Sequence, residues 1–212
     1  MRNSDSSVSL FVALATVLCF YYGIGDSAKP LSKAHAAGAA VTPMEGKSLI
    51  VFVRALSSDA TSVDYRKSPL FSLKGSESQP ELIGILSAKT KLAYEIDPGQ
   101  YLFMVVGENA DFMTAEVLPN RVYYVLVLAR IGNRAAIYSL KAVDRQAQTA
   151  EDFQELFASS NWIRNTPASL NWASSNMATI RPIQHQYYRL WTQKPDSEKP
   201  RLLPDHGTGG RP

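Results

Sequence analysis

The feature that most constrains this chain is a series of short apolar runs, separated by turn residues, between residues 47 and 143. Ser48–Leu56 and Val122–Arg130 are rich in β-branched and aromatic residues, which favour extended strands. Gln100–Val106 follows an Asp-Pro-Gly turn, in which proline presets φ and glycine tolerates a positive φ. Further runs of this kind span residues 69–73, 81–86, 90–96, 112–118 and 135–143.

These runs predict about eight strands with regular turn signals and no helical periodicity between them. We therefore expect a mainly β domain over residues 47–145: an antiparallel β-sandwich of Ig-like or jelly-roll-like type. Several of the runs are apolar on both faces. One face packs on the opposite sheet of a sandwich, so the second apolar face needs a cover.

Helical signals in the C-terminal third predict that cover. Thr149 precedes Glu151 and Asp152. A threonine caps the start of a helix and acids stabilise its positive end, so this pattern predicts a short helix over Ala150–Ala158.

A longer helix is predicted to begin at Thr166 and Pro167, with threonine as the cap and proline in the first turn. Pro182 is expected to kink or split it. We expect residues 146–193 to form a helical appendage that packs on the sandwich, and the Pro-, Gly- and charge-rich residues 194–212 to be a disordered tail. Apolar or large side chains recur along one face of the helix every three or four residues: Leu170, Ala173, Met177, Ile180, Gln184, Tyr187 and Trp191.

The N-terminus has the pattern of an export signal. Residues 8–24 carry no charge and are mainly apolar, and Ala34-His35-Ala36 has the form of a cleavage site. Three interpretations remain open: a cleaved signal peptide within residues 1–36, an uncleaved N-terminal anchor, or a lipoprotein signal with lipidation at Cys19. Each predicts an exported protein of the periplasm or cell envelope. Residues 37–46 are small and flexible, as in a linker.

Composition narrows the classes of function. The chain has 22 Lys and Arg against 19 Asp and Glu, a net charge of only +3, whereas nucleic-acid binders concentrate basic charge more strongly. We therefore predict no nucleic-acid partner. Cys19 is the single cysteine, so the chain cannot form an internal disulfide.

Few residues suggest chemistry. His35, His185 and His206 lack the spacing of metal ligands or of a Ser-His-Asp arrangement, and we predict no catalytic residue and no cofactor. Oxygen-bearing side chains gather in one loop at Glu108, Asn109 and Asp111, which are weak candidates for a Ca²⁺ site. The alternative is that Asn and Asp stabilise the turn by bonding backbone groups.

Two further carboxylates, Glu95 and Asp97, flank Ile96 and should share one face of a strand. Such a pair is the arrangement used in glycoside hydrolysis.

Basic and aromatic residues share the segment from Trp162 to Lys194, which contains no Asp or Glu. A helix of this composition can lie at a membrane interface or bind a partner. The competing interpretation is that its apolar face packs on the sandwich while the arginines stay in water. The aromatic residues that would form a partner or membrane surface are Trp162, Trp172, Tyr188 and Trp191.

The sequence also resembles a group of uncharacterised bacterial secreted proteins and lipoproteins that share a β-sandwich domain of unknown function. The resemblance rests on IGIL at 83–86, on YE and PG within 94–99, on FMVVGENADFM at 103–113 and on YYV at 123–125. It implies an envelope location and a sandwich fold, and it brings no activity.

The sequence therefore predicts an exported, non-enzymatic protein with a binding or scaffolding role, whose partner is an envelope protein or a membrane surface. The alternative is a glycan- or small-ligand-binding module that uses exposed aromatic side chains. A third possibility is an enzyme with a carboxylate site.

Overall fold

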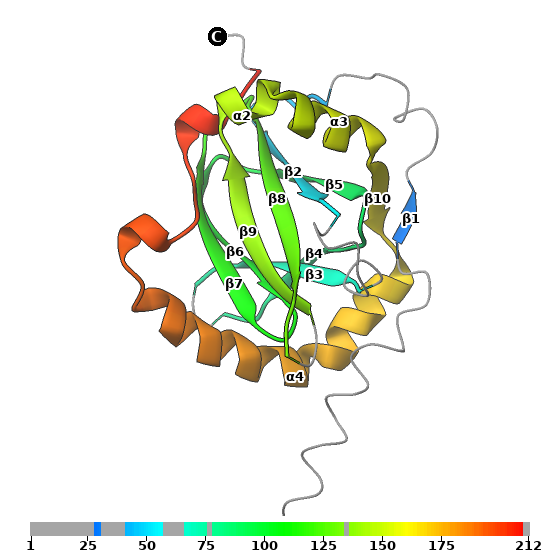
Figure 1. The fold of residues 1–212 in the computed structure, drawn as a ribbon, viewed down its shortest axis with the longest axis vertical. Helices are drawn as coiled ribbons and strands as arrows, with labels where there is room; N and C mark the ends of the chain where they lie inside the picture. The colour runs from blue at the N-terminus through cyan, green and yellow to red at the C-terminus, as the bar shows by residue number, and fades with distance from the viewer. Residues whose placement is uncertain (1–27, 31–40, 57–65, 76–77, 134–135, 210–212) are drawn as a thin grey trace, which may run out of the picture.

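The computed structural model describes residues 28–30, 41–56, 66–75, 78–133 and 136–209, and Figure 1 shows their arrangement. The described chain is mainly β, with two mixed sheets and three α-helices. The strands are β1 (Ala28–Pro30), β2 (Ser48–Arg54), β3 (Ser68–Leu73), β4 (Glu81–Leu86), β5 (Thr90–Ile96), β6 (Gly99–Val106), β7 (Ala110–Val117), β8 (Val122–Ile131), β9 (Ala136–Val143), β10 (Asn161–Asn165) and β11 (Arg201–Leu202).

The first sheet has the strand order β1-β10-β5-β2-β8-β9. Its interior pair β2–β8 is parallel, and so is β10–β5, which corrects the expectation of a wholly antiparallel arrangement. Between β2 and β8 the chain crosses to the other sheet and back twice, first through β3 and β4 and then through β6 and β7, and β8 then lies beside β2 in the same direction. Alternating apolar runs predict strands, but they carry no information about which strands become neighbours.

The second sheet has the order β11-β7-β6-β3-β4 and is antiparallel except at β11, which pairs in parallel with β7. The two sheets share one hydrophobic core. Phe52 of the first sheet meets Phe103 of the second edge to face, with ring centroids 5.5 Å apart. Neighbouring residues such as Val53 and Met104 point to the outer faces, which explains why these strands are apolar throughout.

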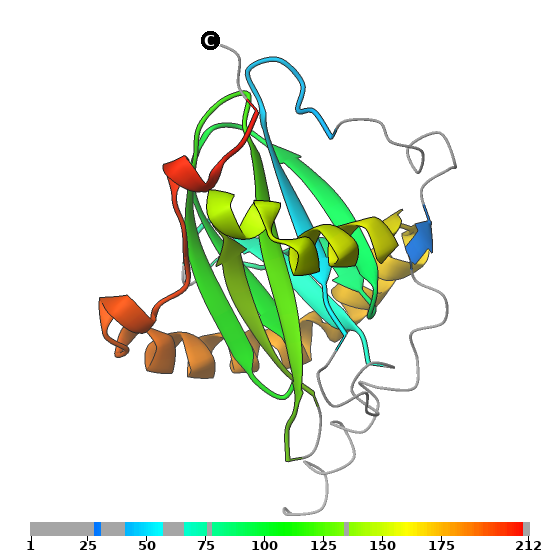
Figure 2. The ribbon, with the colours of Figure 1, turned by 45° about the horizontal axis from the view of Figure 1, so that its top comes forward.

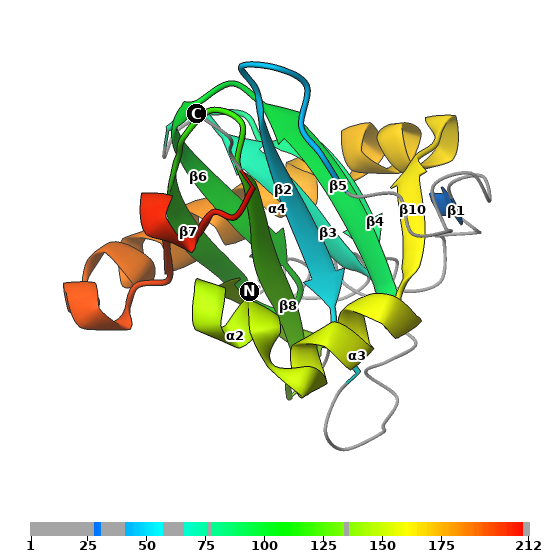
Figure 3. The ribbon, with the colours of Figure 1, turned by 90° about the horizontal axis from the view of Figure 1, so that it is seen from above.

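Helices cover both outer faces (Figures 2 and 3). The short helices α2 (Arg145–Thr149) and α3 (Glu151–Ser159) follow β9, and α3 confirms the predicted helix near 150–158. The cap expected at Thr149 is wrong, because Thr149 ends α2 and the cap of α3 is Ala150, which makes no side-chain cap bond. Side chains of α3 pack on the outer face of the first sheet together with Trp162. Lys91 of β5 lies in this layer over the rings of Phe157 and Trp162, and its ammonium donates to the carbonyl of Phe157 near the end of α3.

The long helix α4 (Pro167–Thr192) covers the outer face of the second sheet, as its apolar periodicity predicts. Thr166 and Ser169 form a capping box at its start. Of the two outcomes expected at Pro182, a kink or a split, the split does not occur, since α4 continues through this residue. Pro182 is on the exposed side, and the helix follows a curved path around the sheet (Figure 1). Curvature that is convex toward solvent accommodates the missing hydrogen bond of a proline.

Residues 194–209 depart from the expectation of a disordered tail. They form the 3₁₀ turns η2 (Asp196–Glu198) and η3 (Pro204–His206), with β11 between them. Leu202 of β11 is buried in the core between the sheets. Composition suggested disorder, but one buried leucine and a row of backbone hydrogen bonds are enough to order the segment.

Candidate functional site

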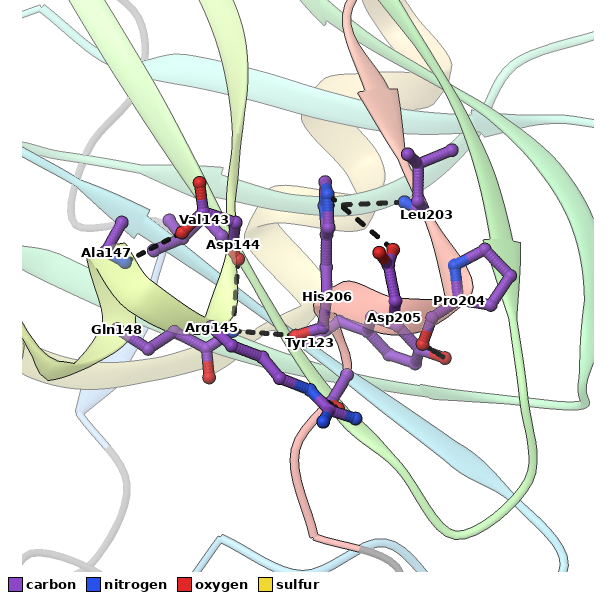
Figure 4. Close-up of polar contacts among 11 residues, drawn as sticks. Tyr123, Val143, Asp144, Arg145, Ala147, Gln148, Leu203, Pro204, Asp205 and His206 are labelled. Carbon is purple, nitrogen blue, oxygen red and sulfur yellow. Dashed lines mark hydrogen bonds and ion pairs between the residues drawn. The ribbon is translucent and has the colours of Figure 1, made fainter.

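A network of polar contacts holds the C-terminal segment against the end of the sheets (Figure 4). From α2, the Gln148 amide donates to the carbonyls of Val143 and His206, at 3.0 and 2.8 Å. Arg145 donates to the carbonyl of Gly207 at 3.0 Å. We call this network the C-terminal clamp. Its side chains bind backbone atoms, so a search of the sequence for patterns of catalytic side chains does not detect this network.

The centre of the C-terminal clamp is Tyr123, a buried side chain of β8. Its hydroxyl accepts from the Leu118 amide at 2.8 Å and donates to the Pro204 carbonyl at 3.4 Å. Burial raises the pKa of the Tyr123 phenol above its usual value, so the hydroxyl remains a donor at neutral pH. A side chain at Gly207 would meet the Tyr123 ring at 2.7 Å, which explains the glycine there.

His206 lies in the C-terminal clamp, and its ring serves the local turn. Its Nδ1 accepts from the Leu203 amide at 3.4 Å, and its Nε2 lies 3.9 Å from the carboxylate of exposed Asp205. The nearby hydroxyl of Thr208 donates to the side-chain amide oxygen, Oε1, of Gln148 at 3.1 Å. These contacts hold the segment in place and bring no hydroxyl to His206. His185 lies half-buried on α4, and His35 falls outside the described residues.

The predicted cation loop instead joins the edges of the two sheets. The Asn109 side chain both donates to the Tyr138 carbonyl, at 3.0 Å, and accepts from the Tyr138 amide, at 2.9 Å. Asp111 accepts from the Leu140 amide at 2.9 Å, and the Glu108 amide bonds the Ala136 carbonyl. These contacts thereby provide hydrogen-bond partners for backbone groups along the edge of β9 that does not pair with β8. Within the described ranges, no group of three or more His, Cys, Asp or Glu is arranged to hold a metal ion.

Asp111 is a buried carboxyl, with 8% of its surface exposed. Desolvation raises its pKa above 3.8, and the hydrogen bond from Leu140 opposes that shift only in part. Asp111 is therefore an interior acid whose negative charge is unfavourable because it is desolvated. Sequence patterns alone did not distinguish it from an aspartate in an ordinary loop.

The carboxylates Glu95 and Asp97 have separate structural partners. Glu95 accepts from the Met44 amide at 2.9 Å, and Asp97 pairs with the Lys47 ammonium at 2.6 Å. That pairing raises the pKa of Lys47. Both contacts hold residues 44–47 against the β5–β6 turn. The two acids therefore have a structural role.

The four aromatic residues predicted as a partner surface pack against the sheets. Trp172, Tyr188 and Trp191 join the apolar layer between α4 and the second sheet, where Tyr188 stacks on Trp191 with ring centroids 5.7 Å apart. Trp162 meets Phe157 edge to face in the layer beneath α3. The interpretation that α4 packs its apolar face inward is the one that the structure supports.

The opposite, outward face of α4 is the surface that sequence reasoning did not isolate. Arg181 and Arg189 are exposed there, and the 26 residues of the helix include no Asp or Glu. On the other side of the molecule, α3 exposes only acidic charges, at Glu151, Asp152 and Glu155. The helices α3 and α4, which lie on opposite sides of the sheets (Figures 2 and 3), therefore carry exposed charges of opposite sign.

Two predictions concern residues that the structure does not describe. Cys19, the candidate lipidation site, lies outside the described residues, as do residues 8–24. Within the parts of the chain that are described, no helix combines the length and apolarity needed to cross a membrane. Comparisons with protein-family models, with curated proteins and with solved structures find no match for this chain.

Proposed function

We propose that this chain is an exported envelope protein with a non-enzymatic binding or scaffolding role, and that the outward face of α4 is its docking surface. Its two sheets form a β-sandwich that acts as a rigid support. The envelope location rests on the apolar residues 8–24 and on the resemblance to secreted and lipoprotein families.

One observation carries the proposal: α4 is a surface helix of 26 residues in which both charges are arginines. Surface helices of soluble domains normally mix both signs of charge. The inward face of α4 is fully used in packing on the second sheet. The outward face of α4 is not needed for folding. Selection for binding to a negatively charged partner therefore accounts for a helix that carries positive charges alone.

The alternative of a glycan-binding module has less support. It depends on exposed aromatic side chains, and the four named for it pack on the sheets. A cavity at the β6–β7–β11 end, whose lining includes Gln100, Tyr101 and Arg201, has a volume of about 220 Å³, and a depression on α4 lined by Gln186, Arg189, Leu190 and Gln193 has a volume of about 310 Å³. Both volumes lie at or below the lower end of the range of about 300–1,000 Å³ that is common for small-ligand pockets. We therefore rank this function second and the carboxylate enzyme third.

Cross-linking in intact cells tests the proposal. A photoreactive amino acid is placed at Ser175, exposed on α4, and in a matched control at Ala158, exposed on α3. We expect cross-links to an envelope component from position 175 that disappear in the Arg181→Glu/Arg189→Glu variant, and none from position 158. Equal cross-linking from the two positions would contradict a docking surface on α4.

A further inference from the structure

The first sheet meets the second where β9 lies beside β7, and side chains bridge the two strands. β9 is the last strand of the first sheet, whereas β7 lies in the second sheet between β6 and β11. Asn109 bonds both the amide and the carbonyl of Tyr138, and Asp111 accepts from the amide of Leu140. We call these four residues the β7–β9 seam.

The backbone of β9 divides its hydrogen bonds between the seam and β8. In an antiparallel pair, the amide and carbonyl of one residue point to the same side, and successive residues point to opposite sides. Tyr138 and Leu140 point toward the seam, so Ser139, which lies opposite Leu128 of β8, points into the β8–β9 ladder. The seam can therefore open while the β8–β9 ladder stays closed.

Both ends of the seam are fixed more firmly than its middle. At one end the Glu108 amide bonds the Ala136 carbonyl, and a side chain at Gly107 would meet that carbonyl at 2.3 Å. At the other end β7 pairs with β11 from Thr114 onward. Between these ends the strands depend on the side chains of the seam, and a joint with few backbone bonds is the kind of place where a fold opens locally.

Asp111 is the seam residue whose preference for the closed state depends on its charge. Its side chain is 8% exposed, and desolvation raises its pKa above 3.8. The hydrogen bond from the Leu140 amide and the positive charges of Lys194 and Arg130 oppose this rise in pKa. Opening the seam would bring the carboxyl into water, where its pKa returns to the ordinary value.

The charged groups that act on Asp111 come from two places. Lys194 follows the end of α4, and Arg130 lies on β8. The residue of β6 opposite Asp111 is the uncharged Val105, and α4 itself packs on the other face of β7, against Phe112. Lys194 and Arg130 therefore soften the desolvation of the carboxylate.

We propose that the β7–β9 seam is a pH-sensitive joint, which is closed most firmly when Asp111 is protonated and opens more readily once Asp111 is ionised. Opening separates Asn109 and Asp111 from β9 and presents the backbone groups of Tyr138 and Leu140 to solvent. Such groups form a strand edge to which another strand can pair. This inference goes beyond the proposed docking surface on α4 and does not depend on it.

Proton linkage gives the direction of the effect. Between 3.8 and the higher pKa of Asp111 in the closed state, the closed seam binds more protons than the open seam. The equilibrium constant for opening therefore rises with pH in this window, by at most about tenfold per pH unit for one proton. Above the closed-state pKa both states are ionised, and the opening constant becomes independent of pH.

Amide hydrogen exchange of the full chain, resolved by residue with NMR, measures this opening. Exchange of the Tyr138, Leu140 and Ser139 amides is followed from pH 4 to pH 8, and each rate is corrected for the intrinsic rate at that pH. We expect the opening constants of Tyr138 and Leu140 to rise together with pH. Both should exceed the opening constant of Ser139 by about tenfold or more, because Ser139 is released only when the β8–β9 ladder breaks.

Three variants separate the charge of Asp111 from its packing. Asp111→Asn keeps an acceptor for the Leu140 amide and should abolish the pH dependence. Lys194→Gln removes a positive charge near Asp111, so the rise should extend to higher pH. The matched control, Lys141→Gln, removes an exposed lysine of β9 and should leave the curve unchanged. If Asp111→Asn does not fold, the shift in Lys194→Gln still decides whether charge governs the seam.

Three results would overturn the inference. Equal opening constants for Ser139, Tyr138 and Leu140 would mean that the seam opens only when the whole domain unfolds. A response to pH at Leu140 without one at Tyr138 would mean that a single bond is lost and the seam stays closed. A pH dependence that persists in Asp111→Asn, or one that Lys194→Gln does not shift, would show that the charge of Asp111 does not control opening.

Discussion

Asp111 is an interior carboxyl between the two sheets, and its ionisation should limit stability at neutral pH. Its pKa is raised in the folded protein by desolvation. Between the unfolded value of about 3.8 and the higher folded value, the folded state therefore binds more protons than the unfolded state. Stability contributed by this group is present below that window and is lost as the pH rises through it.

The variant Asp111→Asn tests this assignment, because asparagine can still accept from the Leu140 amide without carrying a charge. We expect it to unfold at higher denaturant concentration than wild type at pH 7, by about 1 kcal/mol, and to lose that advantage near pH 3. Urea titrations at both pH values measure the difference. A variant that is less stable than wild type at pH 7 would show that the carboxylate charge is favourable there.

Lys91 is a buried cation whose pKa is lowered by desolvation. Between the folded pKa and 10.5, the unfolded state binds more protons than the folded state, so the contribution of Lys91 to stability rises with pH. Lys91→Met keeps the packing against Phe157 and Trp162 without this titration. We expect the stability of wild type relative to Lys91→Met to increase between pH 8 and pH 10.

Comparing the two proteins at each pH removes the effect of the tyrosines, whose titration they share. Lys141→Met, at an exposed position of β9, is the control for the loss of a surface lysine. A difference between wild type and Lys91→Met that does not change with pH would mean that the Lys91 ammonium is solvated in the folded protein.

At the scale of elements, β11 is the shortest strand of the second sheet, yet it carries a core residue. Leu202 is 1% exposed between the sheets, whereas its neighbour Leu203 is 38% exposed. Leu202→Ala should lower the free energy of unfolding by about 2–5 kcal/mol, the usual cost of a buried leucine. Leu203→Ala should change it by less than about 1 kcal/mol. Similar values for both, from chemical denaturation, would show that β11 does not dock in solution.

The sequence is informative about these elements where the pattern is local. Alternation of apolar residues predicted the long strands, and Thr166 with Pro167 predicted the start of α4. The parallel pairing of β2 with β8 depends on contacts distant in sequence, so a local pattern does not reveal it. Residues 194–209 were missed because their order comes from one buried leucine and from backbone bonds to the C-terminal clamp.

In the candidate sites, too, local sequence patterns identify individual residues, whereas contacts between distant parts of the sequence decide what those residues bind. The sequence grouped Asn109 and Asp111 as candidate cation ligands or turn-stabilising residues, but it did not reveal their hydrogen-bond partners, which lie 29 positions away on β9. The aromatic residues of the C-terminal third were recognised as a group, whereas their inward direction depends on how α4 sits on the sheet. Once that face is assigned to packing, the outward basic face follows from the helical period.

Across the whole molecule, helices with exposed charges of opposite sign lie on the two sides of a mainly apolar core, which also holds the buried side chains of Arg54 and Asp111. The acidic α3 and the basic α4 face away from each other on the two sides of the sheets (Figure 3). Such a molecule is oriented by a charged surface, because one face is attracted and the other repelled. An envelope protein with a fixed orientation could act as a scaffold without a binding pocket.

The most direct test of a docking surface on α4 is hydroxyl-radical footprinting of the protein in native envelope preparations and in purified form. Leu170 and Leu190 are about half exposed on α4, and Ile131 is similarly exposed at the end of β8. We predict that oxidation of Leu170 and Leu190 falls several-fold in the envelope while that of Ile131 is unchanged. Equal oxidation of the α4 leucines in both preparations would contradict the proposed docking surface.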